Sequence, residues 1–568
     1  MKRFAIFFIV ASLLPGVVRS QAQQVEKRVE VSKAYMPRIE SAARLPLHPD
    51  LVDTVVLRPE VDYAVTPLSI RTRLDVRPIR PATLNYWQFD RPLPFYLKAG
   101  MGYPLHSDLD FHASTQNADI GYAAGYINHD GSYGRIPRTP GSTRMALRMD
   151  NRIGAAAGLY LGRHLLEGEV AYRNEIYDRY GMFPGIAVFD AGGRRTVGDL
   201  RARVRIGDDF VDLSRWNFDV VLSGGRWWNP LDAASGRDDQ RSFGGKASVG
   251  RGFGRHRLIL GAGFEGEWGG DRRIASGSSF GYYDRTFSAA LRYGYRNEMV
   301  DLELGADYYH DKVAGRRGAD YVTPRLSLRF ALGGGGFVPY LEADGHLRRN
   351  DMRALFGVNP YYAPAAAGAM LANTVDYGMR LGVNGALAGN RLTYRLYVGY
   401  TFIENNCFWY FGPTAGGEAG FDLRQGRLNV MSLNGELEYR PVSNFIFSIG
   451  GHGSTYFDHQ PLSICLPEFE GTVQARYRHR KFSAGVIFRM QSIRYMSEVE
   501  DLAAADPVVV RNRRIPYTLD LGVDADWYVA ENVTVFAEGR NLCNRKMYEW
   551  NGFPQWGVGF TVGVKLVF

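Results

Sequence analysis

The C-terminal segment is the feature that most constrains how this chain can fold. From Phe560 to Phe568 apolar residues occupy every second position, with Thr561, Gly563 and Lys565 between them. A segment of period two that ends on an aromatic residue is typical of the closing strand of a bacterial outer-membrane barrel. Strands cross hydrocarbon only in a closed barrel, because every backbone polar group must be paired there. The segment therefore predicts an all-β fold, a transmembrane antiparallel β-barrel.

The N terminus predicts export. Lys2 and Arg3 precede an apolar run that ends near Leu14, and Ser20-Gln21-Ala22 offers a small-residue cleavage site. The apolar run is shorter than the roughly 20 residues that a membrane-spanning helix needs. We therefore expect residues 1–22 to be a removed signal peptide, and the mature chain to lie in the outer membrane of a Gram-negative bacterium.

Composition agrees with a barrel. The 568 residues include 66 glycines, 34 tyrosines and 32 phenylalanines, yet the mean hydropathy is only -0.24. Alternating strands average to neutral hydropathy because half of their side chains face a wet interior. The formal charge of +9 has two open explanations: an affinity for anionic lipopolysaccharide or cargo, or a polar interior alone.

Connections of two lengths alternate along the chain, and short turns belong to the periplasm whereas long loops belong to the outside. Ten short turns plus one strand at each end give about 22 strands, within a range of 18–22, between Pro94 and Phe568. The predicted turns lie at residues 116–117, 162–164, 207–214, 252–257, 297–298, 333–336, 389–390, 441–444, 479–481 and 530–532. The predicted outer loops lie at residues 131–143, 178–195, 229–239, 350–373, 404–425 and 496–512.

The block from Asn532 to Leu542, continued by residues 544–552 and the closing strand, resembles the C-terminal end of TonB-dependent outer-membrane receptors, particularly those of the Bacteroidota. The resemblance implies a 22-stranded barrel and a role in ligand uptake. The specific match covers under a tenth of the chain, and the strand count extends it loosely to the remainder.

The region before the barrel departs from that family. TonB-dependent receptors carry a globular plug of well over a hundred residues, whereas residues 23–92 form a short segment with eight prolines from Pro37 to Pro92. Proline disrupts helices and central strands, so we expect a periplasmic or lumen-docking extension and no folded plug. Residues 29–34 faintly resemble the segment with which such receptors engage TonB, although an ordinary extended segment has the same pattern. The predicted domains are thus 1–22, 23–92 and the barrel, 93–568.

Three ways of filling a lumen this wide stay open at this point. The N-terminal extension, inward-folded outer loops, or another protein could each close it.

Motifs for chemistry are few. The sequence has no His-Glu-x-x-His, no Cys-x-x-Cys and no phosphate-loop pattern, and its histidines do not cluster at ligand spacing. His452, Asp458 and His459 are close in sequence, which is weak evidence for catalysis. We therefore predict no enzyme, no catalytic residues, no metal and no cofactor.

Aromatic side chains are concentrated in two predicted outer loops. Phe408, Trp409 and Tyr410 lie in one, and Tyr361 and Tyr362 in the other. Aromatic rings supply rigid contact area, so these five residues are the predicted ligand- or partner-binding site. The alternatives are that they form part of the membrane-interface girdle or pack upon each other across the mouth.

The three cysteines, Cys407, Cys465 and Cys543, fall in predicted outer segments. A bridge between Cys407 and Cys465 and three unpaired thiols are both compatible with the sequence.

Two functions are compatible with these features. The first is a barrel similar to TonB-dependent receptors that takes part in transport or ligand passage across the outer membrane. The alternative is a non-transporting accessory or structural subunit of an outer-membrane assembly or secretion complex. The expected partners are outer-membrane lipids and lipopolysaccharide, with a periplasmic or surface lipoprotein and TonB as open possibilities and nucleic acid excluded.

Overall fold

A computed structural model describes residues 93–568, apart from short internal gaps at 116–118, 140–141, 182–192, 231–236, 274–278, 333–335, 363–370, 414–418, 458–461, 503 and 505–506. The predicted signal peptide (1–22) and extension (23–92) lie outside the described residues. Among the residues described, no helix has the length and apolar character needed to span a membrane.

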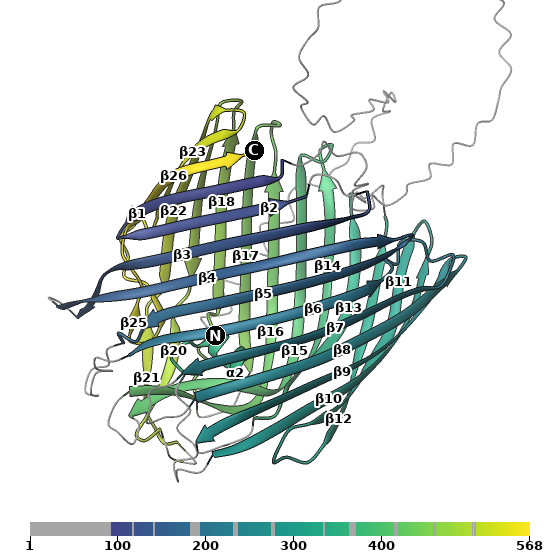
Figure 1. Cartoon of the computed structure of the whole chain (residues 1–568), viewed down its shortest axis with the longest axis horizontal. Helices are drawn as coiled ribbons and strands as arrows, with labels where there is room; N and C mark the ends of the chain where they lie inside the picture. Colours follow the sequence, from purple (N-terminus) through teal and green to yellow (C-terminus); the bar gives the residue numbers. More distant parts are fainter. Residues whose placement is uncertain are drawn as a thin grey trace, which may run out of the picture. The chain divides into compact units, whose positions relative to one another are not determined.

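The described chain is built almost entirely of β-strands, which run side by side and tilted around one wall (Figure 1). They are β1 (Phe95–Tyr103), β2 (His106–Ser114), β3 (Gly121–Thr139), β4 (Ser142–Leu161), β5 (His164–Asp178), β6 (Arg194–Gly207), β7 (Asn217–Pro230), β8 (Arg237–Phe253), β9 (His256–Arg273), β10 (Ser279–Arg296), β11 (Val300–Lys312), β12 (Ala319–Phe330), β13 (Val338–Arg348), β14 (Thr374–Leu387), β15 (Leu392–Pro413), β16 (Ala419–Tyr439), β17 (Phe445–Phe457), β18 (Phe469–Arg478), β19 (Phe482–Gln491), β20 (Arg494–Val499), β21 (Val509–Ile515), β22 (Thr518–Ala530), β23 (Val533–Arg540), β24 (Tyr548–Trp550), β25 (Phe553–Pro554) and β26 (Gly559–Val567).

The wall closes on itself as an antiparallel barrel. Each strand from β1 to β18 pairs with its successor, β19 pairs with β22, β22 with β23, β23 with β26, and β26 with β1. The hairpin β20–β21 branches off the wall and the small pair β24–β25 forms a separate sheet. Removing β20 and β21 from the 24-stranded sheet leaves the 22 strands that the sequence predicts.

The seam between the first and last strands is tightly packed. Phe536 of β23 is 1% exposed, and its ring has the ammonium groups of Lys98 and Lys565 at 4.8 and 5.1 Å from the centroid. A Cβ at Gly563 would lie 2.1 Å from the carbonyl oxygen of Ala99 and 2.7 Å from the Phe536 ring. The closing strand therefore needs glycine where it crosses this ring.

Side chains alternate between two solvents, as predicted. On β22, Val523 and Trp527 are exposed on the outer surface, whereas Asp524 on the opposite face pairs with Arg476 at 2.8 Å across the lumen wall. Apolar side chains meet lipid and charged side chains pair inside, which is the distribution that a bilayer imposes on a barrel.

The predicted short turns that fall on described residues all coincide with connections at the end of the barrel where both chain ends of the wall lie, the periplasmic end. The predicted turn at 116–117 and residues 333–335 of another lie outside the described residues. The predicted outer loops are partly wrong, because several are strand. Residues 131–143 largely belong to β3 and β4, and residues 404–425 largely to β15 and β16, including the segment Asn405–Gly412. These hairpins keep their backbone hydrogen bonds well beyond the roughly 9–11 residues needed to cross the membrane.

Candidate ligand site in the barrel lumen

Buried apolar side chains from opposite sides of the wall meet at the outer end of the barrel. We call this set the mouth cluster: Ile136, Ala146, Tyr177, Tyr180, Val197, Trp227, Met352, Leu355, Phe356, Tyr361, Tyr362, Trp409, Phe411, Phe421, Leu423, Met496, Ile515, Trp550 and Phe553. They come from the outer ends of β3–β7, from residues 349–373, from the β15–β16 and β20–β21 hairpins, and from residues 541–558. The outer loops thus pack on one another across the mouth.

Aromatic contacts hold the mouth cluster together. The rings of Tyr361 and Phe553 stack with centroids 3.6 Å apart, and Tyr362 meets Trp409 edge to face at 5.3 Å. Trp409 in turn meets Trp550 at 5.6 Å. These ring contacts join three loops that are far apart in the sequence. Each contact removes apolar ring surface from water and so stabilises the packing of the loops.

The β15–β16 hairpin is buried on both faces. A bulge between Ile403 and Asn406 shifts its register, after which Trp409 faces the mouth cluster while Phe408 and Tyr410 face a second apolar group. That second group also contains Leu428, Leu462, Val499 and Leu502.

The five aromatic residues predicted as a binding site are therefore all buried. Their exposed fractions are 3% for Tyr361 and Phe408, 4% for Tyr362 and Tyr410, and 7% for Trp409. They pack across the mouth, which is an arrangement that the sequence left open, and a role in ligand contact stays a prediction.

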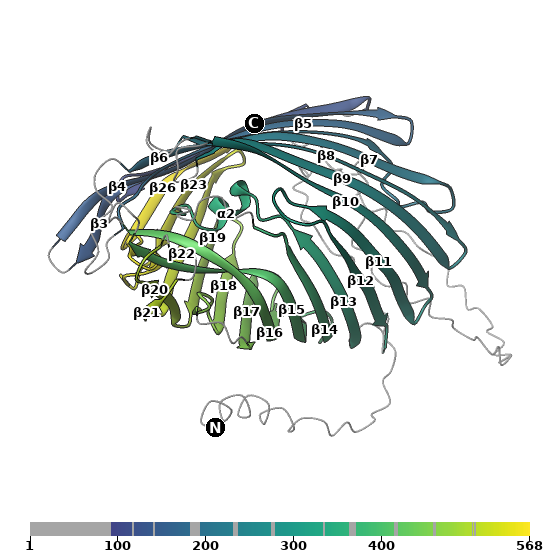
Figure 2. The same ribbon diagram turned by 90° about the horizontal axis from the view of Figure 1, so that it is seen from below.

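Residues 349–362 fold into the lumen and contain the short helix α2 (Met352–Val358), which Figure 2 shows inside the ring of strands; the described chain resumes at residue 371. Two arginines of this segment pair with lumen-facing carboxylates of the wall: Arg349 with Glu267 at 3.0 Å and Arg353 with Asp199 at 2.9 Å. Its far end is fixed by Asn373, whose amide donates to Asp311 at 2.9 and 3.0 Å. These contacts anchor α2 against the inner wall at three strands.

A cavity of about 590 Å³ lies in the lumen beneath α2. Its lining includes five arginines and two carboxylates: Arg152, Arg173, Arg201, Arg203, Arg353, Glu169 and Asp199. The register of β4–β6 places six of these side chains on neighbouring strands, where they face inward, and Arg353 reaches them from α2.

Carboxylates bridge most of these arginines. Asp150 accepts hydrogen bonds from Arg152 at 2.6 Å and from Arg173 at 2.9 Å, and Asp199 pairs with Arg201 at 2.6 Å as well as with Arg353. Arg203 is exposed to the lumen and forms no ion pair within 4 Å among the described residues, and Glu169 lies opposite it in the register of β5 and β6. The cavity therefore presents an available guanidinium to an anionic group.

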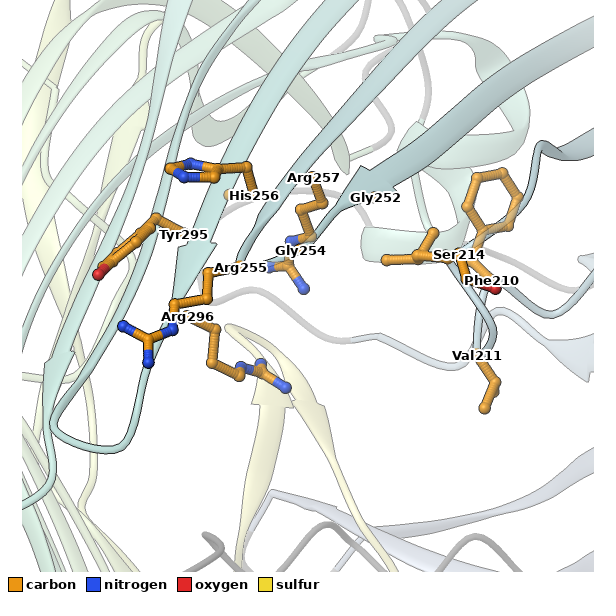
Figure 3. Close-up of a pocket in the computed structure, with 12 residues that line it drawn as sticks. Phe210, Val211, Ser214, Gly252, Gly254, Arg255, His256, Arg257, Tyr295 and Arg296 are labelled. Atoms are coloured by element: carbon orange, nitrogen blue, oxygen red, sulfur yellow. The ribbon is translucent and has the colours of Figure 1, made fainter.

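A second cavity, of about 640 Å³, opens at the periplasmic end. Figure 3 shows Arg255, Arg257 and Arg296 on one side of it and Phe210 and Val211 on the other. Arg257 pairs with Glu303 at 2.7 Å and Arg296 with Asp301 at 2.5 Å. The cavity thus combines an apolar side with a charged side.

Several ionisable groups of the outer loops have pKa values shifted from their usual range, and Tyr180, Cys465 and Glu498 are among them. Burial raises the pKa of Tyr180 to about 12 and that of Cys465 to about 11. Partial burial also opposes ionisation of Glu498, but hydrogen bonds from Arg511 and Arg513 outweigh it and hold the pKa of Glu498 below its usual value. Glu498 of β20 therefore stays ionised and joins the two strands of the β20–β21 hairpin through Arg511 and Arg513 of β21.

The cysteines carry no bridge: Cys407, Cys465 and Cys543 are free, and the first two pack against the mouth cluster. Within the described ranges, no group of three or more potential ligand side chains is placed to hold a metal ion. His452 faces the lumen, where it hydrogen-bonds Asn434 at 2.6 Å and Ser454 at 2.8 Å; Asp458 and His459 lie outside the described residues.

Comparison with known proteins finds the fold but no relative in sequence. No family model and no curated protein matches the chain. Among solved structures, the siderophore receptor PirA from Acinetobacter baumannii superposes with a TM-score of 0.64 at 11% identity, covering 84% of this chain and 80% of that one. The copper transporter OprC gives 0.63 at 13% identity with the same coverages. The ferripyoverdine receptor of the outer membrane of Pseudomonas aeruginosa gives 0.63 at 11%, covering 84% and 72%.

These similarities confirm the predicted resemblance to outer-membrane receptors at the level of the barrel fold. Together with the closed barrel and its apolar outer face, they place the chain in the outer membrane.

Proposed function

We propose that this chain passes a ligand across the outer membrane through its lumen, with the mouth cluster as the outer gate. The observation that carries the proposal is the arginine-lined cavity beneath α2, covered on its outer side by loops that meet across the mouth. Similarity of the barrel to siderophore and copper transport proteins supports a transport role, although a shared fold alone does not decide function.

The ligand that fits this cavity best is anionic. Arg203 forms no ion pair within 4 Å among the described residues, and Arg152 and Arg201 line the same cavity, so the arginines of the lining outnumber its two carboxylates. Guanidinium groups bind carboxylates and phosphates through two parallel hydrogen bonds. A solute with such a group would compete for these arginines as it moves inward.

The proposed parts follow the predicted division of the chain. Residues 1–22 direct export, residues 23–92 form a periplasmic or lumen-docking extension in place of a folded plug, and residues 93–568 form the pore. The aromatic residues Phe408, Trp409, Tyr410, Tyr361 and Tyr362 would contact a ligand when the gate opens. Engagement of TonB through residues 29–34 would then supply the energy for opening.

Single-channel conductance tests the proposal. Four purified proteins are compared in planar bilayers: the mature chain, a chain lacking residues 23–92, a chain with Arg203→Glu, and a control with Arg489→Glu. Arg489 also faces the lumen but is already paired with Asp520 at 3.3 Å. We expect truncation or ligand to open the pore, and Arg203→Glu to lower the permeability of anions relative to cations more than the control does. If all four proteins stay closed to every anion tried, the transport proposal is wrong.

A second function is supported by the periplasmic cavity of Figure 3. Its apolar side and its arginines would suit an extended peptide with an acidic residue, as in an accessory subunit that binds a periplasmic lipoprotein partner. Crosslinking from position 211 in cells, followed by mass spectrometry, distinguishes the two functions: a recurrent multi-protein complex favours the accessory subunit.

A further inference from the structure

Three side chains on neighbouring strands of the barrel form a continuous hydrogen-bond chain outside the lumen. The hydroxyl of Ser107 on β2 lies 2.7 Å from Nε2 of His129 on β3. On the other side of the ring, Nδ1 of His129 lies 2.6 Å from Oδ1 of Asn151 on β4. These are the contacts of a nucleophile, a base and a group that orients the base.

All three residues face the membrane. Ile127 and Ile153 are 43% and 50% exposed on the outer surface, and side chains alternate along a strand, so His129 and Asn151 share their face. The register pairs His129 with Leu109 on β2, which places Ser107 on that face as well. Ser107 is itself paired with Met101, an outward side chain that is 66% exposed. Apolar groups therefore surround the polar chain.

The hydrogen-bond chain lies at the outer edge of the apolar band. His129 is the ninth residue of β3 counted from the periplasmic end, and Asn151 is the eleventh of β4 counted from its periplasmic end. A tilted strand crosses the hydrocarbon in about 9–11 residues, so both residues lie near the outer leaflet interface. In that layer the ester groups of lipids join acyl chains to polar headgroups.

The hydrogen bonds assign a role to each side chain. An amide oxygen can only accept, so Asn151 Oδ1 accepts from His129 Nδ1–H, which leaves Nε2 unprotonated. Nε2 then accepts from the Ser107 hydroxyl and can remove its proton. The hydrogen bond between Ser107 and His129 is accessible because residue 131 is a glycine. A Cβ at Gly131 would lie 3.0 Å from both Ser107 Oγ and His129 Nε2 and would cover the bond.

We propose that Ser107, His129 and Asn151 form a hydrolytic site for carboxylic esters of outer-leaflet lipids, an activity separate from passage through the lumen. Ser107 is the nucleophile, His129 the general base and acid, and Asn151 the residue that orients the imidazole. The apolar surface around Ser107 holds the acyl chain, and the lipid reaches the site from the membrane without entering the barrel.

The reaction balances without a further reactant except water. Ser107 Oγ bonds to the ester carbonyl carbon as its proton passes to His129 Nε2. The bond from that carbon to the alcohol oxygen then breaks, and the departing oxygen takes the proton from His129. Water next gives a proton to His129 and its oxygen to the acyl carbon, which breaks the acyl–serine bond and returns the proton to Ser107. The products are a free fatty acid and a lipid that has lost one acyl chain.

The chain contains its own control for this geometry. Ser454, His452 and Asn434 make the same sequence of contacts at 2.8 and 2.6 Å, but they face the lumen, and Ser454 is 7% exposed. A lipid in the outer leaflet cannot reach them. Substitution of Ser454 therefore removes a hydroxyl from an equivalent hydrogen-bond chain and leaves the membrane face unchanged.

The test measures fatty acid release by the purified mature chain in mixed micelles. The substrates are a diacyl phosphatidylethanolamine, lipopolysaccharide and a dialkyl ether lipid that has no ester, and the variants are Ser107→Ala, His129→Ala and Ser454→Ala. Folding is checked for each variant by its heat-dependent mobility on a gel. We expect release from an ester lipid and none from the ether lipid. The rate of fatty acid release should fall by at least about 100-fold in the Ser107→Ala and His129→Ala variants. The Ser454→Ala variant should keep the full rate.

The ester lipid that is cleaved identifies the source of the substrate, phospholipid or lipopolysaccharide. A long-chain alkyl fluorophosphonate should in addition form an adduct at Ser107, located by peptide mass spectrometry. Release that persists in Ser107→Ala would overturn the proposal, as would an adduct at Ser454 in place of Ser107. Absence of both release and adduct in the folded chain would overturn it too.

Discussion

Replacing Arg349 with alanine should open the barrel. Arg349 belongs to the inward-folded segment and pairs with Glu267 of the wall at 3.0 Å, and the two side chains are 14% and 2% exposed. Removing one partner of a buried ion pair leaves the other charge buried and uncompensated, at a cost of about 3–5 kcal/mol. Glu267 keeps a hydrogen bond from the Tyr282 hydroxyl at 2.8 Å, so the lower end of this range applies.

If the closed state is destabilised by about 3 kcal/mol relative to the open state, the ratio of open to closed barrels increases about 150-fold. The adjacent residue provides a matched control. Arg348 pairs with Asp376 at 3.1 Å, but its side chain is 57% exposed. An exposed pair contributes about 0–1 kcal/mol, so Arg348→Ala should change the ratio by less than about fivefold.

The assay is the frequency of open events in planar bilayers, recorded for the two variants and the unchanged chain under the same salt. Equal frequencies for Arg349→Ala and Arg348→Ala in folded protein would refute the reasoning, because the buried pair would then contribute nothing to closure. More frequent opening with Arg349→Ala alone would identify residues 349–373 as the part that moves.

Three further predictions concern the seam and the outer loops. Gly563→Ala should lower barrel stability by about 1–3 kcal/mol, seen as a lower urea midpoint, because its Cβ would clash with backbone at the seam; Gly450→Ala should not, since nothing lies within 4 Å of a Cβ there. Because the folded pKa of Glu498 is depressed, its stabilising effect is present above the unfolded pKa of about 4.3 and is lost as the pH falls through the folded value. The protection of the β20–β21 amides against hydrogen exchange, corrected for intrinsic exchange rates, should consequently fall as the pH is lowered below about 4.3, and Glu498→Gln should remove this dependence. Cys465, a half-buried thiol whose pKa is raised to about 11, should react with maleimide at pH 7.5 much more slowly than the exposed Cys543; similar rates would show that the mouth cluster opens readily.

Much of the barrel could be predicted from the sequence because a bilayer imposes a local rule. Each crossing must alternate apolar and polar residues, and each short turn must separate two such runs, so the pattern around residues 530–532 or 479–481 is visible within about 20 residues. Strand number and the positions of the periplasmic turns follow from that rule. The bulge in β15 and the extension of β15 and β16 beyond the membrane do not, since outside hydrocarbon the same residues can form loop or strand.

For the candidate sites, too, the sequence predicts which residue types are present but not which side chains come together. The sequence singled out Tyr361, Tyr362, Phe408, Trp409 and Tyr410 for their aromatic content, and the structure buries all five in contacts between loops. The arginines of the lumen cavity were visible as alternating charges on β6, but not their grouping with Arg353, which reaches them only because α2 folds inward.

The alternation of residues along the chain is therefore enough to assign one face of each strand to lipid and the other to water, and from that to predict a closed barrel in a membrane. The pairs of side chains that meet across strands and loops become visible only in the folded chain. Ser107, His129 and Asn151 are about 22 residues apart along the chain, and no motif spacing connects them. They meet because the register of three strands is set by backbone hydrogen bonds and turn lengths summed over the hairpins, information that is spread over the whole segment and absent from any one position.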